Sequence, residues 1–483
     1  MLGFKQLENI GFIHVRDLIC CNSPYGEERV RNMRFYAPGE EATLQTELDN
    51  IALAARAYAD MPETLSDLEH AFMLLKDVRR SIAACGSETL SEIALFEIKR
   101  FLTQFEAIAA LYGKISRVFP FDGIFIEPEP LAPALRILTP DNTDTAAFHI
   151  SSAYSERLAD IREKKRGLEL QMRNTANQQE LAALQSARQA AVAEEEDEER
   201  RIRGELSRLL APYKDAMLTA ADMIGRLDFL LTKAKLAAQH NAVKPDISED
   251  MCIELEDMIN PEVDSILSQS GRSFTPVSIE LSRGATVITG ANMGGKSVAL
   301  KTVALNVILF HAGMYVFAKR ARIPLLNHIT LISEELEDTK RGLSSFGGEI
   351  QRLKEELGYA RERSLMLFDE FARGTNPEEG AKIVRVLLKR LNRENAISVL
   401  TTHYDGVAGC ARAHYRVIGL RDFSVEDAVK NGESGISAIA RHMNYGIYRA
   451  DNETDCPRDA LSICRLILHG EDVLEELVKE YEE

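Results

Sequence analysis

Apolar residues recur at three- and four-residue spacings along the first 150 residues, which is the pattern of amphipathic helices. Three such runs predict helices over residues 40–59, 65–84 and 90–112, and a further run predicts a helix over residues 224–238. Four prolines between residues 120 and 133 interrupt the pattern and predict a loop or a short extended connection. The first half of the chain is therefore expected to be helical.

The pattern changes between residues 155 and 210, where Glu, Arg, Lys, Gln and Ala dominate and proline is absent. This composition predicts long, solvent-exposed helices, arranged as an antiparallel pair that turns near residues 174–178. An unbroken acidic run at residues 194–199 is interpreted as a solvated helix face in preference to a binding site. Such an acidic face fits poorly with encirclement of DNA.

Short apolar or β-branched runs in the second half predict three buried strands, over residues 285–289, 365–368 and 397–401. Apolar residues at helical spacing follow the first of these strands over residues 298–309 and reappear over residues 349–357. This order of strands and helices predicts an α/β domain.

Candidate chemistry begins directly after the first of these strands. Residues 290–297 read GANMGGKS and fill every required position of the phosphate-binding pattern G-x-x-x-x-G-K-S. In such a loop backbone N–H groups surround phosphate oxygens, the lysine reaches the β- and γ-phosphates, and the serine hydroxyl ligates Mg²⁺. The loop lies between a predicted strand and a predicted helix, so Lys296 and Ser297 are expected to bind a nucleoside triphosphate with Mg²⁺.

Polar residues also follow the other two predicted strands. Asp369 and Glu370 end the second one, where the aspartate can hold Mg²⁺ through water and the glutamate can orient or deprotonate the attacking water. His403 follows the third strand, and the order of motifs matches ATPases in which the imidazole senses the γ-phosphate. An ordinary strand-to-loop junction and a structural histidine are the alternative interpretations of these residues.

These motifs together resemble those of the MutS family. GANMGGKS is similar to the family's phosphate loop, LFDEFARGTNPEEG to its Asp-Glu strand and the loop that follows, and TTHY to its histidine switch. LSSFGGE, at residues 343–349, is similar to its Ser-Thr-Phe signature segment. The resemblance implies an ABC-type P-loop ATPase domain that dimerises, with each site built from one subunit's phosphate loop and the other subunit's signature segment.

The resemblance also implies roles for single residues. Glu370, His403 and Lys296 would be catalytic, Ser297 and Asp369 would serve Mg²⁺, and Ser344 would contact the γ-phosphate bound to the opposite subunit. Ser344 could equally be an ordinary helix N-cap. Phe274 could stack on adenine or could be a core phenylalanine. The ATP-binding residues implied in all are Gly290, Asn292, Met293, Gly294, Gly295, Lys296, Ser297, Val298, Ser344 and Phe274.

Two positions depart from the family pattern without removing a phosphate ligand. Ala291 replaces the usual proline, and Val298 replaces the usual threonine.

A fainter resemblance extends over the flanking segments. GFIHVRDLICCNSPYGEERV resembles the start of the family's core domain, and IGRLDFLLTKAKLA resembles the helix that joins this core to the ATPase. The expected organisation is an all-α core or lever domain at residues 1–245 with a helical-hairpin arm at 155–210, an ABC-type ATPase domain at 246–425, and a small helical dimerisation segment at 426–483. No room is expected before the core for mismatch-recognition and connector domains.

Composition narrows the class of protein. The chain has 483 residues, 45% of them hydrophobic, and no uncharged apolar run long enough to span a membrane, so no membrane partner is expected. Its seven cysteines are scattered without a C-x-x-C pair, which argues against a disulfide framework and a zinc site. Because the start of the chain also lacks the pattern of a secretory signal, a cytoplasmic location is expected.

The sequence leaves open which class of molecule such an ATPase would act on, here called its load: DNA or another protein. Family precedent favours double-stranded DNA, in mismatch repair or recombination. The formal net charge of −17 and the acidic run at residues 194–199 instead favour a protein client, such as a metabolic enzyme that an ATP-driven chaperone would reactivate. Strong DNA binding by so acidic a chain requires a local concentration of positive charge.

Overall fold

The computed structural model describes residues 2–140, 149–290, 294–333, 345–420, 442–451, 460–468 and 472–482. Contacts divide the chain into two compact units, which are described separately. The helical unit comprises Cys20–Met33 and Asn50–Ala234, and the sheet unit comprises Met1–Ile19, Arg34–Asp49 and Lys235–Glu483. The unit boundaries fall inside α4 (Glu41–Asp60) and α11 (Lys214–Gln239), so these two helices contribute residues to both units.

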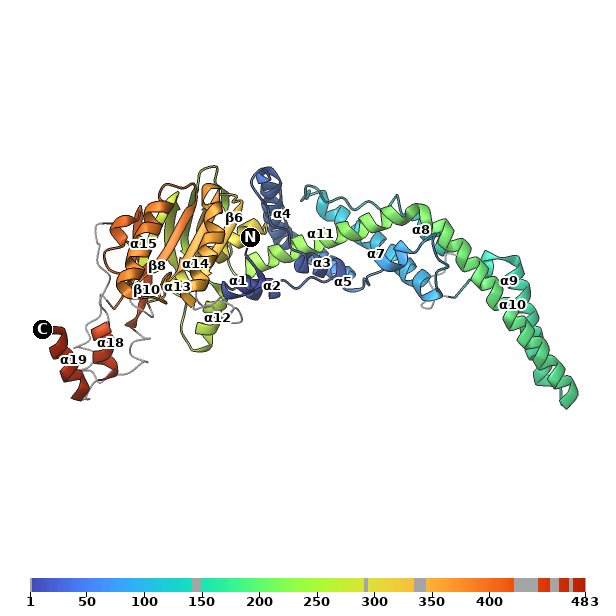
Figure 1. Cartoon of the computed structure of the whole chain (residues 1–483). Coiled ribbons are helices and arrows are strands. Elements are labelled where there is room, and N and C mark those ends of the chain that lie inside the picture. The colour runs from blue at the N-terminus through green and yellow to red at the C-terminus, as the bar shows by residue number, and fades with distance from the viewer. Residues whose placement is uncertain are drawn as a thin grey trace. The chain divides into compact units, whose positions relative to one another are not determined.

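The helical unit is built on a core in which α5 (Pro62–Met73) packs against α7 (Glu92–Ser116) (Figure 1). Phe72 of α5 and Phe105 of α7 are among the largest fully buried side chains of the chain. The other helices of the unit pack around this core or extend from it. Among the described residues, five α-helices lie wholly within this unit and outside the arm. They are α3 (Pro24–Arg31), α5 (Pro62–Met73), α6 (Arg79–Ala83), α7 (Glu92–Ser116) and α8 (Ala132–Leu138).

The prediction of one continuous helix over residues 65–84 is wrong, because the structure has two helices there, α5 and α6. Between them the Asp77 carboxylate accepts hydrogen bonds from the backbone N–H of Arg79, at 3.2 Å, and from its guanidinium, at 2.8 Å. An aspartate side chain that bonds a nearby backbone N–H competes with the helical hydrogen-bond pattern. The apolar spacing continues across the break, so it did not reveal the interruption.

The arm consists of α9 (Glu156–Asn174) and α10 (Gln178–Leu210), which pack along each other. Asn177 begins α10 by accepting a hydrogen bond from the backbone N–H of Gln179, at 3.0 Å. At 1.5 Å per residue, α10 is about 50 Å long. The change of direction lies at the turn that the composition predicted.

The acidic run of α10 is not a uniformly solvated face, which corrects the interpretation made from sequence. The side chains of Glu195 and Glu198 are 12% and 3% exposed. Arg162 of α9 binds Glu195 at 2.9 Å and Glu199 at 2.8 Å, and Ser155 donates to Glu198 at 2.7 Å. Glu194 also binds Lys164 of α9 at 3.4 Å, so four of the six acidic residues join the two helices of the arm through ion pairs and hydrogen bonds.

The sheet unit contains a six-stranded sheet in the order β10-β9-β4-β8-β7-β6 (Figure 1). Its strands are parallel except β10, which pairs antiparallel with β9. The three strands predicted from sequence are confirmed as β4, β7 and β8. The strand bounds are β4 (Gly284–Thr289), β6 (His328–Ser333), β7 (Ser364–Asp369), β8 (Ile397–Thr402), β9 (Ala413–Gly419) and β10 (Asn444–Arg449).

A second sheet of four strands has the order β1-β5-β2-β3. Its strands are β1 (Asp246–Ile247), β2 (Cys252–Met258), β3 (Val277–Ser282) and β5 (Arg320–Ile323), and α12 (Pro261–Gln269) lies between β2 and β3 in sequence. In β3 buried and exposed residues alternate, as expected for a strand with one solvated face.

The helices of the sheet unit differ in how far they are buried. α13 (Lys296–His311) contacts β7 and β8 of the larger sheet and β2 of the smaller one, and most of its residues are buried, polar ones such as Thr302 and Asn306 included. α15 (Pro377–Leu391) instead buries one apolar stripe against β4, β7 and β8 and exposes its charged face. α14 (Ser345–Glu356) packs against the same core through Phe346 and Leu353.

The start of the chain belongs to the sheet unit, although the sequence placed residues 1–245 in one domain. The Gln6 amide donates to the carbonyl of Leu331 in β6, at 2.7 Å, and Tyr36 donates its backbone N–H to the carbonyl of His311, at 2.7 Å. The helices of this segment are α1 (Phe4–Asn9) and α2 (Phe12–Asp17). Long-range hydrogen bonds of this kind leave no periodic signal in the sequence.

Composition had suggested a helical segment after residue 426, but the structure also contains a strand there. β10 extends the six-stranded sheet, and α18 (Ala460–Ile467) and α19 (Asp472–Glu482) follow it. None of the helices in the described ranges is long and apolar enough to cross a lipid bilayer.

Candidate functional site

The glycine-rich segment after β4 leads into the N-terminus of α13, and its geometry requires glycine at two positions. Gly295 caps the helix with φ 87°, and a Cβ there would lie 3.0 Å from the ring of Tyr445. A Cβ on Gly290 would lie 2.9 Å from the Cβ of Val417. The first backbone N–H groups of a helix have no partner within it, so this end of α13 favours an anion.

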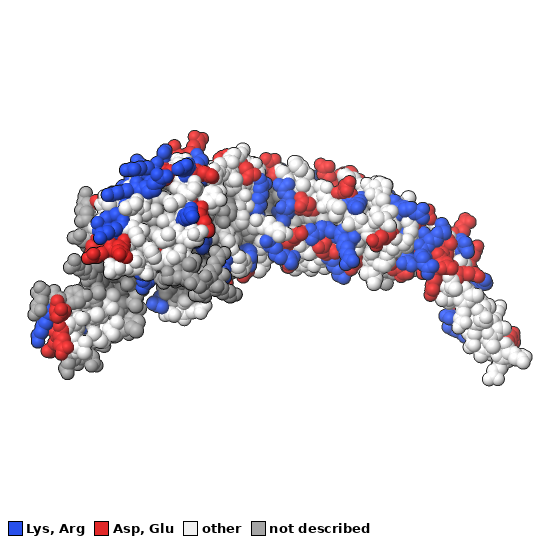
Figure 2. Space-filling model, in the orientation of Figure 1, with Lys and Arg blue, Asp and Glu red and all other residues white. Residues whose placement is uncertain are grey.

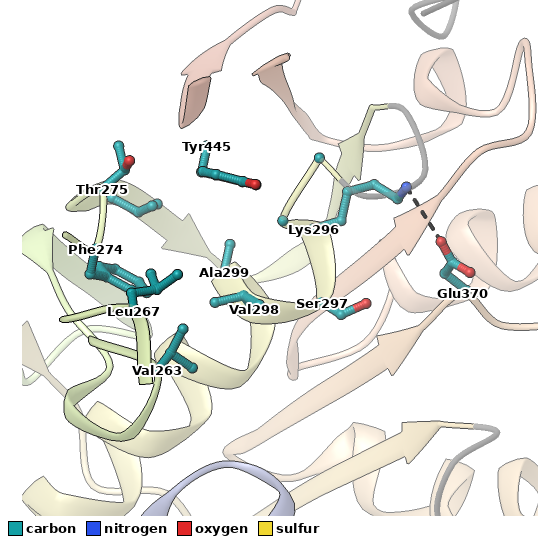
Figure 3. A pocket seen from close by; sticks show the side chains of 13 residues that line it. Val263, Leu267, Phe274, Thr275, Lys296, Ser297, Val298, Ala299, Glu370 and Tyr445 are labelled. Carbon is teal, nitrogen blue, oxygen red and sulfur yellow. Dashed lines mark ion pairs between the residues drawn. The ribbon is translucent and has the colours of Figure 1, made fainter. Parts of the chain in front are cut away.

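Lys296 is the first residue of α13. Its Nζ donates to the carbonyl of Gly290 at 2.9 Å and lies 3.3 Å from Oε1 of Glu370 (Figure 3). Its side chain is only 3% exposed. A buried ammonium with a carboxylate beside it is poised to exchange that partner for a phosphate oxygen.

Asp369 and Ser297 meet at the carboxyl edge of the sheet, since β7 ends where α13 begins. Ser297 Oγ and Thr401 Oγ1 both donate to Oδ1 of Asp369, each at 2.8 Å. Burial raises the pKa of the Asp369 carboxyl, and the two hydroxyl hydrogen bonds counteract that effect. One carboxylate and one hydroxyl fit Mg²⁺, which typically takes one or two protein ligands and completes its shell with waters and substrate phosphates.

Glu370 has a strained backbone, with φ 48° in the left-handed region. Its N–H donates to Thr401 Oγ1 at 2.9 Å, and its Oε2 accepts from Arg373 at 2.8 Å. Strain of this kind persists only when surrounding contacts enforce it, and it is concentrated at functional sites. Thr401 thus positions both adjacent carboxylic residues.

Ala372 is a second strained position in the same loop, with φ 65°. Its N–H donates to the buried carboxylate of Glu349 at 3.0 Å, and its carbonyl accepts from the Tyr404 hydroxyl at 2.7 Å. A Cβ on Gly380 would lie 2.3 Å from that hydroxyl, so α15 can approach only with glycine there. The loop after β7 is therefore held by α14, by α15 and by the segment after β8.

His403 follows β8 and is half-buried. Burial lowers the pKa of its imidazole, the nearby carboxylate of Glu370 raises it, and the positive charges of Lys296 and Arg373 lower it. Its Nδ1 is buried and has no hydrogen-bond partner within the described ranges. The structure therefore brings an imidazole with an unused polar atom to the same edge as Lys296 and Glu370.

A pocket of about 350 Å³ opens beside the N-terminus of α13. Figure 3 shows Phe274, Val263, Leu267 and Tyr445 at one end and Lys296 with Glu370 at the other. An apolar end beside a charged end suits an aromatic base that carries a chain of phosphates.

The sequence had singled out several of these residues but missed others. Val263, Leu267 and Tyr445 line the pocket without having been predicted, and Thr401 and Arg373 contact the predicted carboxylates. Tyr445 lies in the segment that had been compared with the family's dimerisation region, so a signal was present but was assigned to another role. No sequence motif pointed to Val263 and Leu267, which both lie in α12.

The structure places most predicted site residues together. The pocket is lined by Phe274, Gly294, Gly295, Lys296, Ser297, Val298 and Glu370. Gly290 and Asp369 contact this set through Lys296 and Ser297. Asn292, Met293 and Ser344 lie outside the described residues.

Comparison with known proteins agrees with the resemblance to the MutS family that the sequence motifs indicated. Residues 286–461 match the family model of MutS domain V, a P-loop ATPase domain. A protein named Endonuclease MutS2 from Pediococcus pentosaceus is 35% identical over 218 residues, which cover 45% of this chain and 27% of the relative. Proteins of the same name from Levilactobacillus brevis and Agathobacter rectalis are 31% and 33% identical, over 26% of their lengths.

The chain matches only about a quarter of the length of these relatives. The matched segment contains the phosphate loop, the Asp369–Glu370 strand end and His403, in the order described above. Residues 286–461 of this chain therefore form a domain V of the MutS family.

Proposed function

We propose that this chain hydrolyses ATP in the presence of Mg²⁺. The observation that carries the proposal is the meeting of Lys296, the Ser297–Asp369 pair and Glu370 at one end of a pocket whose other end is apolar. The pocket would receive adenine against Phe274 and Tyr445, with the phosphates at the N-terminus of α13. Failure of the purified chain to bind Mg·ATP under native conditions would overturn this proposal.

The proposed chemistry assigns a separate task to each polar residue. Lys296 would neutralise the β- and γ-phosphates, and Ser297 with Asp369 would hold Mg²⁺, which stabilises the charge that develops during phosphoryl transfer. Glu370 would accept a proton from the attacking water, since its carboxylate follows the Mg²⁺ residue directly. His403 would contact the γ-phosphate through its buried imidazole.

The site is proposed to be completed by a second copy of the chain. α14 begins at Ser345, so Ser344 directly precedes a helix of 12 residues. The start of a helix favours a phosphate, and the matching segment in the MutS family faces the partner's nucleotide. A homodimer with two composite sites follows from this assignment.

Composite sites predict complementation between two inactive variants. Lys296→Ala disables the phosphate loop, whereas Ser344→Arg disables the segment offered to the partner. Mixed dimers contain one site in which both defects fall together and one site that is intact, so ATP hydrolysis should return to up to about half the wild-type rate per dimer. The measurement is steady-state ATPase activity of purified heterodimers, with each variant homodimer as its control. No recovery in verified heterodimers would contradict shared sites.

The proposed load of this ATPase is double-stranded DNA. The relatives are named endonucleases, a class that acts on nucleic acid, and the proposal takes from that name only the class of load. ATP binding and hydrolysis would change the positions of helical levers on that load. Nothing in the comparisons favours a protein client, and the acidic run of the arm is partly used in ion pairs within the arm itself.

DNA binding should appear as a salt-dependent affinity. The full chain is expected to bind a fluorescently labelled duplex at about 50 mM salt and to lose at least about tenfold in affinity at 200 mM, because phosphate contacts release counterions. Fluorescence anisotropy without nucleotide, with ADP and with a non-hydrolysable ATP analogue measures this effect. Absence of binding in all three states at low salt would eliminate a DNA load.

A further inference from the structure

The edge of the six-stranded sheet opposite the nucleotide site carries a row of arginines. Arg283 directly precedes β4, Arg363 directly precedes β7, and Arg412 directly precedes β9. Arg393 lies in the turn before β8. Because these four strands are parallel and adjacent in the order β9-β4-β8-β7, the four arginines lie along one edge. We call them the arginine row.

Hydrogen bonds between the turns fix part of this row. Arg412 Nη1 donates to the carbonyl of Arg283 at 3.1 Å, and Arg283 Nε donates to the carbonyl of Glu394 at 3.4 Å. The Asn392 side chain accepts from the N–H of Ala285 and donates to the carbonyl of Cys410, at 2.9 and 2.8 Å. The turns before β9, β4 and β8 therefore form one connected surface.

The charges of the arginine row are not neutralised by carboxylates. Arg283, Arg393 and Arg412 are exposed, Arg363 is partly exposed, and within the described ranges none of the four forms an ion pair. The carboxylate of Glu394 binds Arg390 instead, at 2.6 Å. The exposed acidic residues close to the row in sequence are Glu362, next to Arg363, and Glu280, three residues before Arg283. Arg363 also donates to the backbone carbonyl of Glu249.

Several arginines of the helical unit are, by contrast, paired with carboxylates. In the helical unit Arg29 binds Asp222, Arg79 binds Asp77, and Arg162 binds two glutamates of the arm. The arginine row therefore places four cations without a carboxylate partner in the described ranges along one edge of a chain whose net charge is −17. Figure 2 shows Lys and Arg side chains gathered along one border of the sheet unit. Lys389, in the last turn of α15, precedes Arg393 by four residues in sequence.

We propose that the arginine row binds the phosphate backbone of DNA. Four adjacent strands at about 4.8 Å spacing place the row over about 14 Å, the length of about four nucleotides of one strand. An open, extended row suits a polymer of phosphates better than a single small anion, and guanidinium groups bind phosphate oxygens in pairs. The proposal rests on the DNA load proposed above and names the surface that contacts it.

The position of the row adds a geometric consequence. Parallel strands begin at one edge and end at the other, so the arginine row and the phosphate loop lie at opposite ends of the same sheet. DNA at the row would leave the nucleotide pocket open. Both ligands can therefore bind one sheet unit at the same time.

The test compares two double variants with the same change in charge. Arg283→Ala with Arg412→Ala removes two members of the row, whereas Lys319→Ala with Arg322→Ala removes two cations of the smaller sheet that are paired with carboxylates. The row variant is expected to bind the labelled duplex at least about tenfold more weakly at 100 mM salt. The slope of log affinity against log salt should fall by about two, one for each lost phosphate contact. The control pair should leave both quantities within about twofold of wild type.

A third variant and an activity measurement separate contact from folding. Arg283→Lys with Arg412→Lys retains both charges and should keep the wild-type salt slope. ATP hydrolysis without DNA should remain near wild type in all three variants if the sheet is intact.

The possible failures are distinguishable. If wild type binds DNA and the alanine pair binds it with unchanged affinity and slope, the arginine row has no role in DNA binding, and a different anionic surface such as an acidic protein is its better partner. If wild type itself binds no DNA at low salt, the DNA load proposed above fails together with this inference.

Discussion

Glu370→Gln should reduce the rate of ATP hydrolysis by at least about a hundredfold, within the range expected for loss of a general base. The amide retains the shape of the side chain and can still accept from Arg373, but it cannot take a proton from water. ATP affinity should be unchanged or higher, because the carboxylate that lies 3.3 Å from Lys296 no longer competes with phosphate for its charge. Single-turnover hydrolysis and equilibrium binding of Mg·ATP measure the two quantities separately.

Glu378→Gln is the matched control for this substitution. Glu378 is an exposed carboxylate in the first turn of α15, outside the pocket, and its loss should leave hydrolysis within about twofold of wild type. Comparable hydrolysis by wild type and by the Glu370 variant would remove the assigned role of Glu370.

Lys296→Ala is the second substitution with a large expected effect, and it acts on binding before chemistry. Hydrogen bonds to charged groups contribute about 1.5–3 kcal/mol, so loss of the ammonium should weaken Mg·ATP binding by roughly 10- to 150-fold. The side chain is nearly fully buried, so no other cation can readily replace it. Isothermal titration calorimetry with Mg·ATP measures the loss directly.

Lys382→Ala provides the comparison, since Lys382 lies on the exposed face of α15. Its removal changes the net charge equally and should leave ATP affinity unaltered. An Lys296 variant that binds Mg·ATP as tightly as this control would show that the lysine does not contact the phosphates.

The sequence predicted the elements that its periodicity encodes. β4, β7 and β8 are uniformly buried parallel strands, so each reads as a continuous apolar run, and the polar residues that follow them necessarily meet at one edge. The spacing of the glycine loop likewise placed Lys296 and Ser297 at the start of α13. These inferences depend on neighbours in sequence or on strand order alone.

The remaining features depend on contacts between distant segments. Tyr445 reaches the pocket only because β10 pairs with the edge strand β9, and Glu198 is buried only because Ser155 and two arginines of the arm surround it. No composition or spacing distinguishes such residues from solvated ones. The arginine row could not be predicted from sequence spacing either, because its members lie far apart in the chain. Arg283 and Arg412, which are hydrogen-bonded, are 129 positions apart.

The hydrogen bond between the Ala372 N–H and Glu349 would link the active site to the partner subunit in the proposed dimer. Glu349 lies on the helix that follows Ser344 and grips the peptide two residues beyond Glu370. A displacement of that helix would therefore be transmitted as a pull on the strained loop and would reorient the carboxylate that we propose as catalytic, while Lys296, anchored on a different and largely buried helix, would stay where it is. In the proposed dimer, retention of the nucleotide and its cleavage would thereby be governed by separate parts of the molecule, so a neighbouring subunit would trigger the second without disturbing the first.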